Sequence, residues 1–212
     1  MNNDSYTFPF NTCEIPNKEG ISQPYSVFFN LVSCFIIIYF LCITKSNYSK
    51  LLLFSILLFE AFHTFSHSIH LNNHSQIIIT HLLAYFVNFC YLFALYCYSK
   101  IFPSKIFLFY LIILISFDIY AFQKLPFIVY LSSQFLIFIS LFLYYYKYFP
   151  KDIKNKIPLI FILILFIIIL FINESYNCKK MLNYYSWFPF HIFIEIIAVF
   201  IVYNVSLIFN KL

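Results

Sequence analysis

Long apolar stretches separated by short polar segments run through most of the chain. A membrane-spanning helix needs about 20 predominantly apolar residues. The strands of a membrane barrel would alternate polar and apolar positions, and these stretches do not alternate. The pattern therefore predicts seven spanning helices, at roughly 26–44, 51–71, 76–98, 106–122, 127–146, 157–172 and 188–210.

Composition agrees with a membrane protein. Of the 212 residues, 63% are hydrophobic and only 10% are charged, and there is a single glycine. A soluble domain of this size cannot bury so much apolar surface. We expect an all-α, polytopic membrane bundle, with residues 1–25 as a polar N-terminal segment without a signal peptide and residues 26–210 as the transmembrane domain. The membrane would be an endomembrane, such as that of the ER or Golgi, or the plasma membrane.

The thirteen basic residues are all lysines, and their distribution predicts the orientation. Nine lie in the first, third and fifth connectors and the C-terminal tail: Lys45, Lys50, Lys100, Lys105, Lys147, Lys151, Lys154, Lys156 and Lys211. The other side holds Lys18, Lys124, Lys179 and Lys180. Short lysine-rich loops stay in the cytosol, so the N-terminus would be outside or luminal and the C-terminus cytosolic. Topology accounts for the net charge of +5, and no nucleic-acid partner is expected.

Two of the six cysteines, Cys13 and Cys178, lie outside the predicted spans. Both fall on the predicted non-cytosolic side, where disulfides form and persist. We predict that they pair, with two free thiols as the alternative. The other cysteines lie within spans, where they would serve as small packing residues.

Ionisable groups inside a bilayer are costly and mark candidate functional sites. Eight lie within or at the ends of the predicted spans: Glu60, His63, His67, His70, His81, Asp118, His191 and Glu195. With a rise of about 1.5 Å per residue, all eight fall in the outer half of the membrane. Imidazoles and carboxylates that converge from several helices are typical ligands of zinc. The sequence therefore predicts a metal site near the outer surface.

Other interpretations of these residues remain open. Glu60 and His63 would equally well hydrogen-bond between helices, and His67 would support a ligand rather than bind the metal itself. Asp118 would pair with or cap a neighbouring helix. His70 and His191 would extend toward the membrane surface.

Several motifs resemble the superfamily of seven-span metal hydrolases that includes the alkaline ceramidases, the adiponectin and progestin receptors and the Per1-like proteins. The family carries a serine four residues before a histidine in its second span, like Ser66 and His70. The alkaline ceramidase branch has a Cys-Glu pair like Cys13-Glu14, and an aromatic-Asn-x-x-Ser motif like 29–33. The family's last span opens with two histidines four residues apart, which fall on Trp187 and His191. The third-span aspartate of the family is His81 here.

The resemblance implies a zinc-dependent lipid amidase. Zinc would be bound by His70, His81 and His191, with Glu195 as a fourth ligand or general base. Ser66 would stabilise an oxyanion, and Asp118 or Glu195 would transfer the proton. The resemblance also implies a Cys13–Cys178 disulfide, membrane lipids as partners and a lipid amide as substrate.

Two non-enzymatic functions are alternatives. The first is an inactive receptor-like or scaffold protein that has kept the fold and lost the chemistry. The second is an ion or metal transporter, which would need polar residues through the whole membrane thickness. The predicted cytosolic half carries no ionisable residues within its spans.

Overall fold

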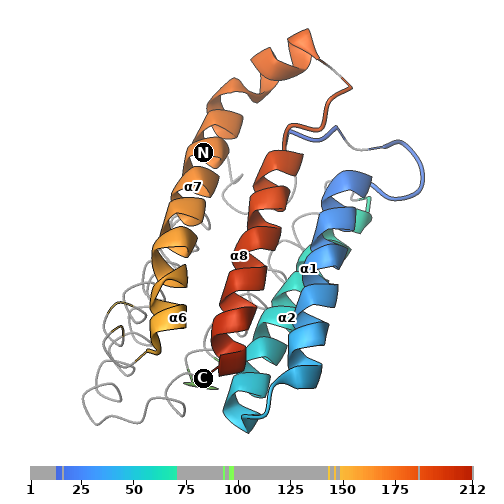
Figure 1. The fold of residues 1–212 in the computed structure, drawn as a ribbon. Helices are drawn as coiled ribbons and strands as arrows, with labels where there is room; N and C mark the ends of the chain where they lie inside the picture. Colours follow the sequence, from blue (N-terminus) through green and yellow to red (C-terminus); the bar gives the residue numbers. More distant parts are fainter. Residues whose placement is uncertain are drawn as a thin grey trace.

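The computed structural model describes residues 13–15, 17–70, 149–185 and 187–211, together with positions 93, 96, 97, 143 and 146. Five helices lie in these residues, and no strand does (Figure 1). They are α1 (Pro24–Ile43), α2 (Asn47–Ser68), α6 (Lys151–Lys154), α7 (Lys156–Tyr184) and α8 (Ile192–Lys211).

Four segments of the described chain are long and apolar enough to cross a membrane: Pro24–Ile43, Asn47–Ser68, Lys151–Glu174 and Ile192–Lys211. They correspond to the predicted spans at 26–44, 51–71, 157–172 and 188–210. The prediction of a helical, membrane-embedded protein is therefore confirmed for this part of the chain. The predicted spans at 76–98, 106–122 and 127–146 lie outside the described residues apart from isolated positions, so seven spans remain a prediction.

Local sequence explains the antiparallel hairpin of α1 and α2. Pro24 opens α1, where its missing N–H costs nothing and its fixed φ suits a helix. The Ser46 side chain caps α2 by accepting a hydrogen bond of 3.3 Å from Ser49 N. Only residues 44–46 separate the two helices, so they pack side by side. The second major contact of α1 is with α8, which also packs against α7 (Figure 1).

The interior of the bundle has an apolar zone and a polar zone. The apolar zone lies where α1 and α8 end and α2, α6 and α7 begin, and includes Ile37, Phe40, Leu52, Leu53, Ile153, Ile208 and Phe209. Toward the opposite end lie the buried ionisable residues of the described chain: Glu14, Glu60, His67, Glu174, His191 and Glu195. Four of them, Glu60, His67, His191 and Glu195, belong to the set expected in the outer half of the membrane, and that placement stays a prediction.

The described lysines also separate between the two ends of the bundle. Lys45, Lys50, Lys151, Lys154, Lys156 and Lys211 lie at the apolar end, and Lys18, Lys179 and Lys180 at the polar end. Lys211 Nζ donates a hydrogen bond to Asp152 Oδ2, which joins the end of α8 to α6. This distribution is the one on which the predicted orientation rests, and the orientation itself stays a prediction.

The predicted connector 173–187 is wrong in its extent, because α7 continues as a helix to Tyr184. The apolar span ends at Glu174, so hydropathy located the edge of the apolar segment and not the end of the helix. No glycine or proline interrupts the chain between Pro158 and Pro189. Asn177 Nδ2 donates to Asn173 Oδ1 at 2.7 Å, one turn apart on the helix.

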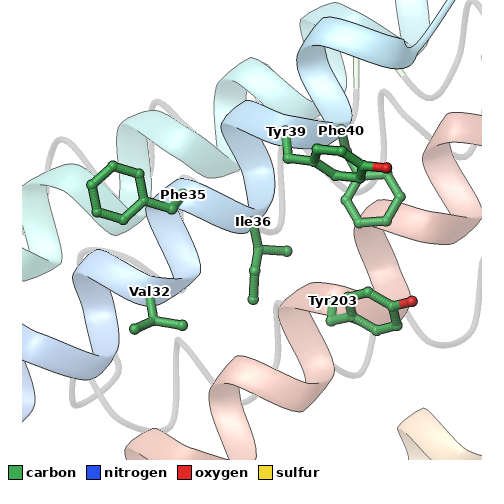
Figure 2. A pocket seen from close by; sticks show the side chains of 6 residues that line it. All are labelled: Val32, Phe35, Ile36, Tyr39, Phe40 and Tyr203. Carbon is green, nitrogen blue, oxygen red and sulfur yellow. The ribbon is translucent and has the colours of Figure 1, made fainter.

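A shallow apolar groove of about 300 Å³ runs between α1 and α8 (Figure 2). Five residues of α1 and one of α8 line it: Val32, Phe35, Ile36, Tyr39, Phe40 and Tyr203. The groove lies on the two helices whose first turns bound the polar zone.

Candidate functional site

The polar zone is closed by the N-terminal segment that precedes α1. Ser22 N donates to Ser68 O at 3.2 Å and Gln23 N donates to His67 O at 3.0 Å, which fixes the segment against the end of α2. A disulfide joins Cys13 to Cys178, with their Cα atoms 5.5 Å apart, as predicted. The segment is therefore held to both α2 and α7.

Glu14 caps the beginning of α1. Its carboxylate accepts hydrogen bonds from Tyr25 N at 3.0 Å, from Ser26 N at 3.2 Å and from the Ser26 hydroxyl at 2.5 Å. These are the amide groups that a helix leaves without partners in its first turn, and the helix dipole favours an anion there. The Glu14 side chain is 3% exposed, so the cap is part of the interior.

Two histidines of α2 and one glutamate of α8 converge at the centre of the polar zone. The Nε2 atoms of His63 and His67 are 3.0 Å apart, and His67 Nε2 is 3.6 Å from Glu195 Oε1. One ligand atom from each of the three residues lies within 4.8 Å of the others. His67 and Glu195 are each 1% exposed. We call His63, His67, Glu195 and the adjoining His191 the His–Glu cluster.

Gln23 determines which nitrogen of His67 carries the proton. Gln23 Nε2 donates to Glu14 O at 3.0 Å, which fixes the amide so that Oε1, which can only accept, faces His67. His67 Nδ1 lies 2.5 Å from that oxygen and must be the donor. A neutral His67 ring then presents a lone pair on Nε2, toward His63 and Glu195. A proton on His63 Nε2 or a cation between the rings satisfies this lone pair.

His191 lies between two carboxylates. Its Nδ1 is 2.9 Å from Glu174 Oε2, and its Nε2 is 3.1 Å from Glu195 Oε1. An ionised carboxylate only accepts hydrogen bonds, so two such neighbours favour the doubly protonated ring. Burial of His191, which precedes the span of α8, disfavours its charged form, but the hydrogen bonds to Glu174 and Glu195 raise its pKa to about 10.

The predicted site residues are distributed as follows. His191 and Glu195 are together in the cluster, as the spacing of one helical turn requires. His70 lies beyond the end of α2, is exposed, and places Nε2 2.8 Å from Gly20 O. The Ser66 hydroxyl donates to His63 O of its own helix at 2.7 Å. His81 and Asp118 lie outside the described residues.

Three members of the site were absent from the predicted ligand set or had roles that the sequence left open. His67, interpreted as a supporting residue, touches both His63 and Glu195. Glu60 approaches His63 at 3.7 Å within α2 rather than across helices. Glu174 was placed in a connector, yet it is 5% exposed and binds both His191 and Cys13 N. The spacing of four residues between His63 and His67 was the available signal.

Comparison of the chain with protein-family models, curated proteins and solved structures found no match. The candidate function therefore rests on the geometry of the His–Glu cluster and on its place in a membrane-embedded bundle.

Proposed function

We propose that this chain is a membrane hydrolase with a zinc centre at His63, His67 and Glu195, and that it cleaves the amide bond of a membrane lipid. The observation that carries the proposal is the convergence of two imidazoles and one carboxylate from α2 and α8, with one ligand atom each within 4.8 Å of the others. Three protein ligands with an open fourth position are the usual arrangement of a catalytic zinc.

The two distances from His67 Nε2 to the other ligand atoms are compatible with such a centre. Tetrahedral zinc with bonds of about 2.0–2.1 Å places its ligand atoms about 3.3 Å from one another. The two distances that involve His67 Nε2 are 3.0 and 3.6 Å, on either side of this value. Gln23 Oε1 accepts a hydrogen bond from His67 Nδ1, the kind of contact that orients histidine ligands. Glu60 Oε2 lies 3.7 Å from His63 Nδ1, close enough to favour the same ring orientation electrostatically.

His191 would be the proton donor of the reaction, and Glu174 would orient its ring. Zinc, when bound, polarises a carbonyl oxygen and lowers the pKa of water. His191 Nε2–H faces Glu195 Oε1, so it is placed to donate a proton at the edge of the cluster. Glu174, on the other side of the ring, fixes its orientation and favours its charged form.

The surroundings favour a lipid as substrate. The cluster lies at the polar end of helices whose remaining length is apolar, which supports a site near the boundary of the membrane. The apolar groove is lined by residues 32–40 of α1 and by Tyr203 of α8, on two of the helices that bound the polar zone (Figure 2). A lipid whose amide lies at the cluster would extend its acyl chain along this groove, toward the middle of the bilayer.

A transporter is the weaker alternative. A transported ion needs polar groups along its whole path. Among the described residues, the interior at the far end of the bundle is filled by side chains such as Ile37, Leu52 and Ile208, each 0% exposed. A scaffold protein would use the same cluster only as a hydrogen-bonded network. Hydrolysis of a lipid amide by the purified protein distinguishes the hydrolase from a scaffold.

The test is hydrolysis of lipid amides by the purified, reconstituted protein. Ceramides and other N-acyl lipids are offered to wild type, His67→Ala, Glu195→Gln and His70→Ala. We expect His67→Ala and Glu195→Gln to reduce turnover by roughly 100-fold or more, because a ligand is lost. His70→Ala is the control, because His70 lies just beyond the end of α2 and outside the cluster, and this variant should retain activity. Absence of hydrolysis by wild type with zinc added would contradict the proposal.

A further inference from the structure

The part of the chain between the spans of α7 and α8 carries large exposed aromatic side chains. Tyr176, Tyr184 and Trp187 are 84%, 74% and 76% exposed, and Tyr185 is 59% exposed. Lys179 and Lys180 are exposed on the same stretch. We call these six residues the aromatic–lysine segment.

Both neighbouring spans place this segment at the edge of the membrane. The candidate span of α7 ends at Glu174, two residues before Tyr176, and the span of α8 begins at Ile192, five residues after Trp187. Beyond the span, α7 continues past the beginnings of α1 and α8 (Figure 1). The aromatic surface extends into the first turn of α8, because Phe188 contacts Trp187 at 5.6 Å and Phe193 at 5.7 Å between ring centroids.

The chemistry of the segment fits the headgroup layer of a bilayer. Tyrosine and tryptophan concentrate where one side of the ring meets hydrocarbon and the other meets water. A lysine pair at this level attracts lipid phosphate and extends its ammonium groups toward it. Exposed aromatic surface of this extent in water would be unfavourable.

We infer that the aromatic–lysine segment binds phospholipid headgroups and holds the polar end of the bundle at the membrane surface. The segment is firmly attached to the rest of the site. Cys178, next to Lys179, is disulfide-bonded to Cys13, and Glu174 of the same helix binds His191. Docking of the segment on headgroups would therefore set the depth at which the His–Glu cluster meets the bilayer.

Trp187 is the only tryptophan of the chain, so its fluorescence reports on this segment alone. The full-length protein is reconstituted in phosphatidylcholine vesicles, with bromine either next to the headgroup or at the ends of the acyl chains. We expect blue-shifted emission, a large loss of intensity with bromine near the headgroup, a smaller loss with deep bromine, and little quenching by acrylamide in the water.

A double variant tests the lysines. Lys179→Ala with Lys180→Ala should shift the emission to the red and increase quenching by acrylamide. The matched control, Lys45→Ala with Lys50→Ala, removes the same charge at the opposite end and should leave the emission unchanged. Emission like that of tryptophan in water, quenched by acrylamide and not by brominated lipid, would overturn the inference. Strongest quenching by deep bromine would overturn it as well.

Discussion

Glu14 is a single buried carboxylate on which the geometry of the polar end depends. It accepts from two backbone amides and one hydroxyl in the first turn of α1, and its own carbonyl oxygen accepts from Gln23 Nε2. Gln23 in turn orients His67. A capping interaction at the start of a helix is thereby linked through one amide side chain to the candidate metal site.

Replacement of Glu14 by glutamine should weaken this arrangement. The variant keeps the shape of the side chain but loses the charge that the helix N-terminus favours. We expect the free energy of unfolding to fall by about 0.5–2 kcal/mol, the usual range for loss of a helix cap. Thermal unfolding in mild detergent measures the effect. Glu19→Gln is the matched control, because Glu19 is exposed in the same segment, and equal stability of the two variants would contradict the assignment.

The histidines of α2 show what helical periodicity predicts and where it fails. Positions four residues apart share a face, so His63 and His67 point toward α8 together. The family resemblance paired Ser66 with His70 at the same spacing, but α2 ends at Ser68. Beyond that residue the chain is extended at Ile69 and the rule no longer applies. The approach of Gln23 and Glu195 comes from residues far apart in sequence, which no periodicity reveals.

At the level of elements, the N-terminal segment connects the polar ends of α2 and α7 and leads into α1; we call it the N-terminal clamp. Hydrogen bonds hold it to α2, and the Cys13–Cys178 disulfide with the contact from Cys13 N to Glu174 holds it to α7. The segment itself forms no helix or strand in residues 13–15 and 17–22. The disulfide was predictable from the positions of the two cysteines outside the spans, but no sequence pattern shows how the segment lies on the helices.

Removal of this disulfide should loosen the clamp. Cys13→Ser with Cys178→Ser abolishes a crosslink between residues separated by 165 positions. We expect a loss of about 2–5 kcal/mol in the free energy of unfolding, the range found for native disulfides. Thermal unfolding and the rate of proteolysis within the N-terminal segment are the measurements.

Cys42→Ser is the matched control for the disulfide, because Cys42 is an exposed free cysteine of α1. Reducing agent should destabilise wild type as the double variant does, and should leave the double variant unchanged. Wild-type stability of the double variant would show that the clamp is held by other contacts.

For the whole molecule, hydropathy predicted four of the spans that the structure describes and the separation of an apolar zone from a polar one. Both follow from the cost of placing ionisable groups in hydrocarbon, which acts on any sequence in the same way. The length of α7 was not predictable from hydropathy, because Ser175–Tyr184 is helical without being apolar. Which side chains meet in the His–Glu cluster depends on how α2 and α8 pack. No pattern in a single sequence predicts that packing.

The orientation of the molecule is a separate prediction. With the lysine-rich end in the cytosol, an epitope tag before Met1 should be accessible to antibody on intact cells or sealed luminal-side-out vesicles. A tag after Leu212 should become accessible only after the membrane is permeabilised. The reverse pattern would place Cys13 and Cys178 on the reducing side, which would disagree with their disulfide.

The most direct test of the proposed metal centre is the zinc content of the purified protein, determined by elemental analysis of wild type, His67→Ala, Glu195→Ala and His70→Ala. We predict about one zinc per chain in wild type and His70→Ala, and loss of the metal from His67→Ala and Glu195→Ala. Metal-free wild-type protein after dialysis against zinc would contradict the account. So would zinc that is lost with His70 and retained without His67.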